Sequence, residues 1–270
     1  MYHSERHKEV CVIMSYITIE GVHKRFVRRG QWTEALSNIQ LDIEQGSFVS
    51  FIGPSGCGKS TLLRIIGGLM DAEEGEIAIG GQSPQELLKA KQFGFVPQQP
   101  ALFPWRTVLQ NMNIPFEVNR QKVFNPVEQG DPIKLLQAVG LGDFVHAYPR
   151  ELSGGMKQRV GIARAFATGA PILLMDEPFS ALDEITKEVL MHQLKTIWEE
   201  HKKTVLFVTH NIQEAVYLSD KVVVMSARPG RVSRVIDIKL ARPRDESVIG
   251  SQAFNDYMAE LRESLRERWG

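Results

Sequence analysis

The 270-residue chain has two cysteines, no excess of charge of either sign and no long apolar run. Cys11 and Cys57 cannot build a disulfide framework, which suits a reducing compartment. A bilayer-spanning helix needs roughly 18 consecutive apolar residues, and the sequence has no such run. Its 32 Lys and Arg balance 32 Asp and Glu, which argues against a broad basic face for nucleic acid. These absences predict a soluble cytoplasmic protein that would reach a membrane through a partner.

A glycine-rich stretch, residues 53–61, follows an apolar run of strand length and precedes a helix-like run. This order is typical of a phosphate-binding P-loop. Glycines let successive backbone N–H groups converge on an anion, which the dipole of the following helix also attracts. We predict that Lys59 reaches the β- and γ-phosphates and that Ser60 binds Mg²⁺. The whole loop is expected to bind ATP: Gly53, Pro54, Ser55, Gly56, Cys57, Gly58, Lys59, Ser60 and Thr61.

A second motif ends the apolar run 172–175 with Asp176 and Glu177. A continuous apolar run of this length is typical of a strand buried on both faces of a parallel sheet. A carboxylate at the end of such a strand, beside a P-loop, is placed to hold Mg²⁺, and this role falls to Asp176. Glu177 would orient and deprotonate a water molecule that attacks the γ-phosphorus.

A third stretch, residues 152–160, reads Leu-Ser-Gly-Gly-Met-Lys-Gln-Arg-Val. Ser153 is a natural helix N-cap, and the glycine backbone can approach a ligand closely. Capping alone would explain this pattern. However, it gives the chain a second helix end that attracts anions. One nucleotide could use both ends only if they face each other, within one chain or across a dimer.

Taken together, these motifs resemble the nucleotide-binding subunit of an ABC transporter over about residues 16–230. Gly53–Thr61 resembles the Walker A motif and Ile172–Asp176 the Walker B motif. Leu152–Met156 resembles the family's signature, with Met156 where glutamine is usual. The remaining matches are Gln98 with the Q-loop, Ser180-Ala-Leu-Asp183 with the D-loop, and His210 with the switch histidine.

The resemblance implies an α/β fold: a P-loop NTPase (RecA-like) core with an antiparallel β subdomain and an inserted α-helical subdomain. It divides the chain into an N-terminal extension (1–14), an ABC ATPase domain (15–250) and a C-terminal amphipathic helix (251–270). The helical subdomain is expected at about 99–168. Met14 is an alternative start of the chain.

The resemblance also implies roles for single residues. Glu177, His210, Lys59 and Gln98 are expected to be catalytic, and Ser60, Gln98 and Asp176 to bind the metal. Two subunits would enclose each ATP, so that the Walker A side is completed by the partner's signature. The ATP-binding set then gains Gln98, Ser153, Gly154, Gly155, Asp183 and His210. Phe26 takes the place of the adenine-stacking aromatic. Trp32 is a competitor, because the loop predicted over Lys24–Gln31 is longer than usual for the family.

Leu102–Val108 and Ala227–Arg231 resemble the nitrate, sulfonate, taurine and bicarbonate importers. This implies integral-membrane permease subunits, an extracytoplasmic solute-binding protein, a homodimer of ATPase subunits at the cytoplasmic face of the membrane, and no nucleic acid. Phe103, Trp105 and the helical insert would form a groove for a permease helix, although Trp105 alone also fits a core position. The rival function is a non-transport ABC-type ATPase acting on nucleic acid or ribosomes. The solute and a heterodimer with a related ATPase remain open.

Overall fold

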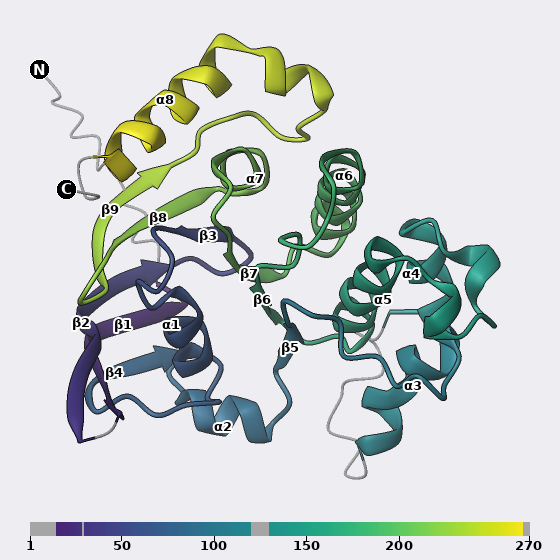
Figure 1. The fold of residues 1–270 in the computed structure, drawn as a ribbon, viewed down its shortest axis with the longest axis horizontal. Coiled ribbons are helices and arrows are strands. Elements are labelled where there is room, and N and C mark those ends of the chain that lie inside the picture. Colours follow the sequence, from purple (N-terminus) through teal and green to yellow (C-terminus); the bar gives the residue numbers. More distant parts are fainter. Residues whose placement is uncertain (1–14, 29, 120–129, 267–270) are drawn as a thin grey trace, which may run out of the picture.

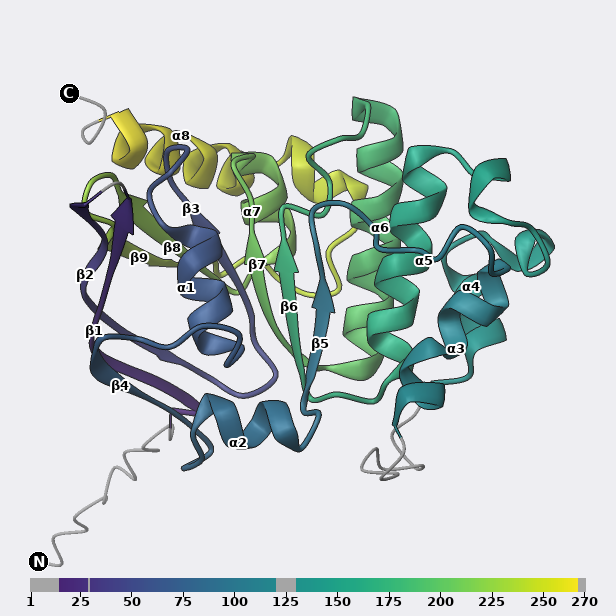
Figure 2. The ribbon, with the colours of Figure 1, turned by 60° about the horizontal axis from the view of Figure 1, so that its bottom comes forward.

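The structure is a computed structural model that describes residues 15–28, 30–119 and 130–266. The predicted N-terminal extension, residues 1–14, and the last residues of the predicted C-terminal helix, 267–270, lie outside this part. Two sheets organise the fold, one with strand order β5-β6-β7-β3-β8-β9 and one with order β2-β1-β4 (Figures 1 and 2). The strands are β1 Ile17–Arg28, β2 Gln31–Ile43, β3 Phe48–Ile52, β4 Glu74–Ile79, β5 Phe93–Val96, β6 Ile172–Asp176, β7 Thr204–Val208, β8 Lys221–Ser226 and β9 Arg231–Asp237.

The larger sheet is parallel from β5 to β8, and β9 joins its edge antiparallel. Its inner strands β3, β6 and β7 are buried along their whole length, because helices or the smaller sheet cover both faces there, whereas edge strand β9 is largely exposed. Along β3, Phe48 and Ile52 belong to one hydrophobic cluster, whereas Val49 and Phe51 belong to another. This alternation follows from the two-residue period of a strand. The predicted α/β core with an antiparallel β subdomain is therefore confirmed.

The helices divide between the two faces and one end of the large sheet. Helix α1 lies between the two sheets, and α6, α7 and α8 cover the opposite face of the large sheet (Figures 1 and 2). Helices α3, α4 and α5 pack on one another beyond β5 (Figure 1). The bounds are α1 Lys59–Ile66, α2 Pro84–Lys89, α3 Val108–Val118, α4 Pro132–Ala138, α5 Gly154–Ala167, α6 Glu184–His201, α7 Ile212–Leu218 and α8 Gln252–Arg266, with 3₁₀ turns at Gly142–Phe144, Pro149–Glu151 and Glu246–Gly250.

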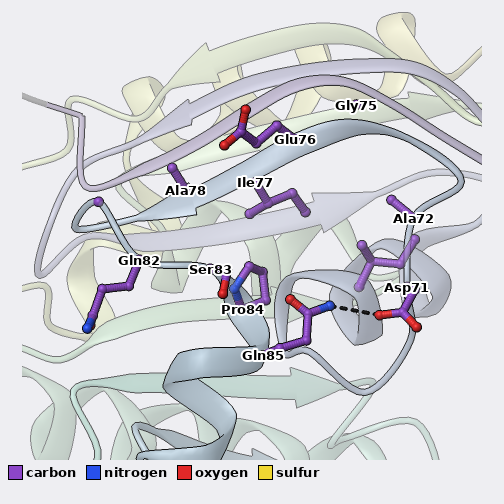
Figure 3. A pocket seen from close by; sticks show the side chains of 12 residues that line it. Asp71, Ala72, Gly75, Glu76, Ile77, Ala78, Gln82, Ser83, Pro84 and Gln85 are labelled. Atoms are coloured by element: carbon purple, nitrogen blue, oxygen red, sulfur yellow. Dashed lines mark hydrogen bonds between the residues drawn. The ribbon is translucent and has the colours of Figure 1, made fainter.

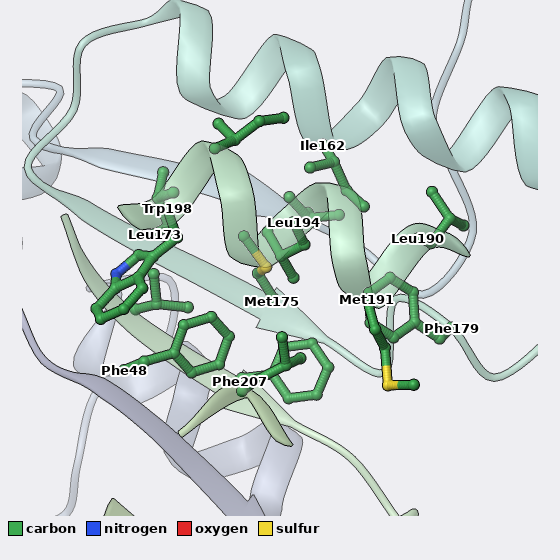
Figure 4. Packing of buried hydrophobic residues seen from close by; sticks show 14 of the residues in the cluster. Phe48, Ile162, Leu173, Met175, Phe179, Leu190, Met191, Leu194, Trp198 and Phe207 are labelled. Carbon is green, nitrogen blue, oxygen red and sulfur yellow. The ribbon is translucent and has the colours of Figure 1, made fainter. Parts of the chain in front are cut away.

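An aromatic cluster joins α6 to the large sheet (Figure 4). The Phe48 ring lies 5.6 Å from the ring of Trp198, edge to face, and 5.6 Å from that of Phe207. Burying side chains of this size stabilises a fold by roughly 1.5–3 kcal/mol each. The indole N–H of Trp198 donates to the Lys203 carbonyl at 2.7 Å, so that its polar atom is satisfied. This packing holds the sheet rigid beneath the site described next.

The prediction of a loop over Lys24–Gln31 is wrong for most of its length. Strands β1 and β2 extend as an antiparallel ribbon in which Phe26 pairs with Thr33 and Val27 with Trp32. Such a ribbon projects beyond the core and meets solvent on both faces, so its side chains need not alternate between apolar and polar. The charge of this segment therefore does not distinguish a strand from a loop.

Helix α8 packs on the core with Phe254 and Leu261, both almost fully buried. Arg234 of β9 donates to the Glu260 carboxylate at 2.6 Å and so holds the polar side of the helix. Among the described helices, none combines the length and the apolar character needed to cross a bilayer.

Candidate active site

The candidate site lies where four neighbouring parallel strands end. The order β5-β6-β7-β3 places the segments after these strands side by side. Those segments carry Gln98 after β5, Glu177 after β6, His210 after β7 and Gly53 after β3. Ligands of open α/β sheets bind at the carboxyl ends of the strands. Residues more than 150 positions apart in sequence are thus brought to one edge of the sheet.

The P-loop leads from β3 into α1, whose N-cap is Gly58 with φ +93°. This left-handed conformation suits glycine, and a Cβ here would also lie only 2.6 Å from Leu36 Cδ2. No side chain caps the first turn of α1, so its N–H groups are available to an anion. The Lys59 ammonium crosses the loop and donates to the carbonyls of Gly53 (2.9 Å) and Pro54 (3.0 Å). It is therefore held where an incoming phosphate would meet it.

Ser60 and Asp176 meet as the spacing of the motifs predicts. The Ser60 hydroxyl donates to Asp176 Oδ1 at 2.6 Å, and the Arg64 guanidinium lies 3.8 Å from Oδ2. Hydroxyl and carboxylate oxygens are ligands that Mg²⁺ accepts, alongside the phosphate oxygens of a nucleotide. The chemistry of this pair therefore fits the predicted metal. The third predicted ligand, Gln98, donates its side-chain amide to Glu177 and Ser180 instead.

Gln98, Glu177 and His210 form a second polar group beside the first. The Gln98 amide donates to Glu177 Oε2 at 3.3 Å and to Ser180 Oγ at 3.2 Å. His210 Nδ1 lies 3.6 Å from the same Glu177 oxygen. Glu177 itself has φ +47°, and its N–H donates to the Val208 carbonyl at 2.9 Å. The backbone of Glu177 is thus fixed while its carboxylate stays partly accessible.

Buried hydrogen bonds hold the segment that carries His210. Thr209 donates to Glu214 Oε2 at 2.5 Å and accepts from the Asn211 N–H at 3.0 Å. Burial raises the pKa of Glu214 above its ordinary value. Asn211 in turn caps α7 by accepting from the Gln213 N–H at 2.8 Å. The position of His210 is therefore set by its neighbours in sequence.

A pocket of about 600 Å³ opens over the P-loop. The Phe26 ring lines it, whereas Trp32, 69% exposed, is not among its described lining residues. Lys24 Nζ lies 5.7 Å from the Phe26 ring centroid. The described lining consists of Phe26, Thr33, Glu34, Ala35, Ser55, Gly56, Gly58, Lys59, Ser60, Thr61, Glu177 and Arg228.

Four of these lining residues were not predicted from sequence. Thr33, Glu34 and Ala35 reach the pocket because β2 returns beside Phe26, a pairing that the loop prediction missed. Arg228 lies in the turn between β8 and β9. Residues 227–231 resemble a stretch of the importers, but no feature of the sequence indicates a contact with the nucleotide.

Cys57 is buried and fills space inside the P-loop. Its side chain is 1% exposed, and burial raises the pKa of its thiol. A neutral buried thiol is not a reactive nucleophile. Cys57 therefore lines the loop from within and does not appear in the described lining of the pocket.

The signature residues lie away from this pocket. Ser153 caps α5 by accepting from the Met156 N–H at 3.2 Å, and a Cβ at Gly154 would meet nothing within 4 Å. A Cβ at Gly155 would lie 2.6 Å from Thr186 Cγ2, in the first turn of α6. Asp183 caps α6 by accepting from the Thr186 N–H at 3.0 Å, and this bond lowers the pKa of Asp183. The predicted ATP-binding residues thus form two separate groups.

A second hollow of about 300 Å³ lies between β4 and α2 (Figure 3). Gln85 donates to Asp71 across it at 2.8 Å, and Glu76 is also among its lining residues. Its described lining contains two carboxylates and no Lys or Arg. Two acidic groups without a cation do not suit a nucleotide phosphate. The nucleotide site is therefore assigned to the pocket over the P-loop.

A family model described as ABC transporter matches residues 36–180, just over half of the chain. The chain belongs to the ABC transporter ATP-binding family. An ABC transporter ATP-binding protein of Methanocaldococcus jannaschii is 44% identical over 93% of this chain and 91% of its own. The aliphatic sulfonates import ATP-binding protein SsuB of Bacillus cereus is 42% identical over 94% of this chain and 97% of its own.

Solved structures agree with this assignment. A dimeric ATP-binding cassette in a post-hydrolysis state, bound to ADP and Pi, is 36% identical. It covers 83% of this chain and 100% of its own length with a TM-score of 0.71. The predicted P-loop NTPase fold and ATPase activity are therefore confirmed at the level of the family. This chain is an ABC ATPase.

Proposed function

We propose that this ABC ATPase hydrolyses ATP to energise a separate membrane permease that imports a small anionic or polar solute of the nitrate, sulfonate, taurine or bicarbonate type. The sulfonate importer relatives, 42–43% identical over most of the chain, support this solute class. The observation that carries the proposal is the hydrogen bond of Gln98 to Glu177 at 3.3 Å. It links the hydrolytic carboxylate to the segment 98–107, where we place the permease.

In the proposed hydrolysis, ATP lies over the P-loop with its base on Phe26. The Lys59 ammonium moves from the loop carbonyls to the β- and γ-phosphates. Bound Mg²⁺, held by Ser60, Asp176 and Gln98, would neutralise charge on the phosphate oxygens. Glu177 accepts a proton from water as the water oxygen attacks the γ-phosphorus, while the bond to the β–γ bridging oxygen breaks and ADP leaves. His210 orients the same water and contacts the γ-phosphate.

We further propose that two copies of the chain enclose two ATP molecules. The P-loop lies in a pocket, whereas the signature presents its free glycine surface elsewhere. A two-fold dimer would bring the Ser153–Gly155 turn of one copy over the pocket of the other. Asp183 accepts from the Thr186 N–H, and the Thr186 side chain lies against Gly155. Asp183 would therefore reach the same interface. The dimeric cassette bound to ADP and Pi supports this arrangement.

The permease contact would use the aromatic segment after Gln98. Phe103 and Trp105 stack with ring centroids 5.1 Å apart, and Trp105 is 70% exposed. A core position for Trp105 is therefore wrong. The buried Asn111 side chain accepts from the Phe103 N–H at 2.7 Å and donates to the carbonyls of Phe103, Arg106 and Thr107. This rigid support displays two large apolar rings to a partner helix.

The test is affinity purification of the tagged chain from detergent-solubilised membranes, followed by identification of its partners. We expect a hydrophobic permease to accompany the wild-type chain, and its recovery to fall at least about tenfold for Trp105→Ala, since exposed aromatic anchors carry much of a binding energy. Trp32→Ala removes an equally exposed tryptophan elsewhere and serves as the matched control. Recovery of ribosomes or DNA in place of a permease would support the non-transport ATPase and contradict the proposal.

A further inference from the structure

The turn between β8 and β9, residues 227–230, has no role in the proposed hydrolysis, yet Arg228 lines the nucleotide pocket.

The backbone of the turn is fixed between β2 and the P-loop. The Gly230 N–H donates to the Ala35 carbonyl at 3.0 Å, and the Gly230 carbonyl accepts from the Ser37 N–H at 2.9 Å. A Cβ at Gly230 would clash with the Cys57 carbonyl oxygen, so the turn lies directly against the P-loop backbone. The position of Arg228 is thus tied to both walls of the pocket.

Arg228 has φ +45°, a left-handed conformation that residues with a side chain rarely adopt. A residue held in such a conformation is a reason to look for function. Within the described part of the chain, no residue hydrogen-bonds or ion-pairs with its guanidinium. Arg231, the first residue of β9, differs, because it donates to the Ser37 hydroxyl at 3.5 Å.

The carboxylates that line the pocket already have other partners. Glu34 lies 3.4 Å from His23 Nδ1, and Glu177 is bonded by Gln98. The other positive group in the described lining is Lys59. Arg228 therefore adds a second positive charge to the pocket that binds a polyanionic nucleotide.

We propose that the Arg228 guanidinium binds the phosphate chain of ATP or ADP and thereby sets the nucleotide affinity of this ATPase. A guanidinium matches phosphate oxygens with two parallel N–H donors. The turn abuts the P-loop at Cys57, where the phosphates bind, and the Phe26 ring already provides a surface for the base. The proposal rests on the assignment of this pocket to ATP, and the experiment below separates the two.

The test measures equilibrium binding of ATP, ADP and adenosine by calorimetry at low protein concentration. The main variant is Arg228→Asn, because asparagine tolerates positive φ. Loss of a charge-assisted contact at an accessible site is expected to weaken ATP and ADP binding about five- to tenfold and to leave adenosine unchanged. Arg228→Lys keeps the charge and should recover part of the lost affinity. Arg228→Gly, which adopts positive φ freely, should repeat the loss if asparagine disturbs folding.

Arg231→Ala is the matched control. It removes a cation just after the turn, outside the described pocket lining, and should leave affinity within about twofold of the wild type. Unchanged ATP affinity in both Arg228→Asn and Arg228→Gly would overturn the proposal. Equal weakening of ATP and adenosine would also overturn it, since that pattern places Arg228 on the base. Lys59→Ala tests the pocket itself: if it binds ATP normally, the assignment of the pocket fails, whatever Arg228 does.

Discussion

Helices α1 and α5 both begin at a glycine-rich turn, but only the start of α1 opens into a nucleotide-sized pocket of the described chain. The first turn of α1 has no side-chain cap. It carries Lys59 and Ser60, and Asp176 lies beside it. The first turn of α5 is capped by Ser153, and a Cβ at Gly154 would meet open space. One end is thus enclosed by its own chain, and the other is presented outward.

The two helix starts therefore have different tasks in the function we propose: the start of α1 binds the nucleotide, and the start of α5 completes the site of another copy. The start of α1 carries the groups that hold phosphate and perform the hydrolysis we propose. At the start of α5, Ser153 accepts from the Met156 N–H, and within the described chain the N–H groups of Gly154 and Gly155 stay available to an anion. A second copy would supply what each end lacks. We therefore expect changes near α1 to act on the isolated subunit and changes near α5 to act on the pair.

The largest expected effect is that of Glu177→Gln, which keeps the shape of the side chain but removes the proposed base. ATP turnover should fall about 10²- to 10⁴-fold, the range typical of a lost general base. Binding of ATP should persist, and ATP-bound dimers should accumulate on size-exclusion chromatography because they no longer reopen. Wild-type phosphate release from this variant would show that Glu177 is not the base.

Lys59→Ala and Ser153→Ala separate the two helix ends in the isolated subunit. Lys59→Ala should weaken ATP binding by the monomer about 10- to 100-fold, since a charge-assisted contact with phosphate is lost. Ser153→Ala should leave monomer binding unchanged and lower the free energy of unfolding by about 1 kcal/mol, the usual cost of a lost N-cap. Calorimetry and chemical denaturation measure the two quantities. Equal loss of monomer binding in both variants would contradict the division.

A smaller effect is expected at the base end of the pocket. Phe26→Ala should weaken ATP binding by the monomer about five- to tenfold, because a stacking surface for adenine is removed. Trp32→Ala is the matched control on the same ribbon and should leave affinity unchanged, because Trp32 is not among the described residues that line the pocket. A larger loss from Trp32→Ala than from Phe26→Ala would reverse the assignment.

Much of the α/β core could be predicted from the sequence, because parallel strands buried on both faces leave continuous apolar runs such as residues 172–175. The meeting of Ser60 with Asp176 could also be predicted, since Asp176 ends one such strand and the loop before Ser60 follows another. The ribbon that carries Phe26 could not, because its charged side chains meet solvent on either strand face. Pairing with β2, which places Thr33 and Glu34 in the pocket, depends on contacts that local sequence does not encode.

Arg228 shows a different limit of sequence reasoning. Residues 227–231 resemble a stretch of the importers, but this resemblance does not indicate that Arg228 lines the nucleotide pocket. Its placement depends on Gly230, which fits between the backbones of Ala35 and Cys57. That contact joins segments almost 200 residues apart, so it becomes visible only when the fold is known.

The central claim, that each site is shared between two copies, can be tested with mixed dimers. Both copies carry Glu177→Gln to retain ATP; one also carries Lys59→Ala and the other Ser153→Arg, which blocks the start of α5. Neither copy alone should form a dimer that retains ATP, although the Ser153→Arg copy can still bind ATP as a monomer. If the sites are shared, mixing pairs an intact P-loop with an intact signature, and one ATP should be retained per mixed dimer. If each site were built within one chain, every site in the mixture would carry a lesion, and the absence of retained ATP would contradict the account.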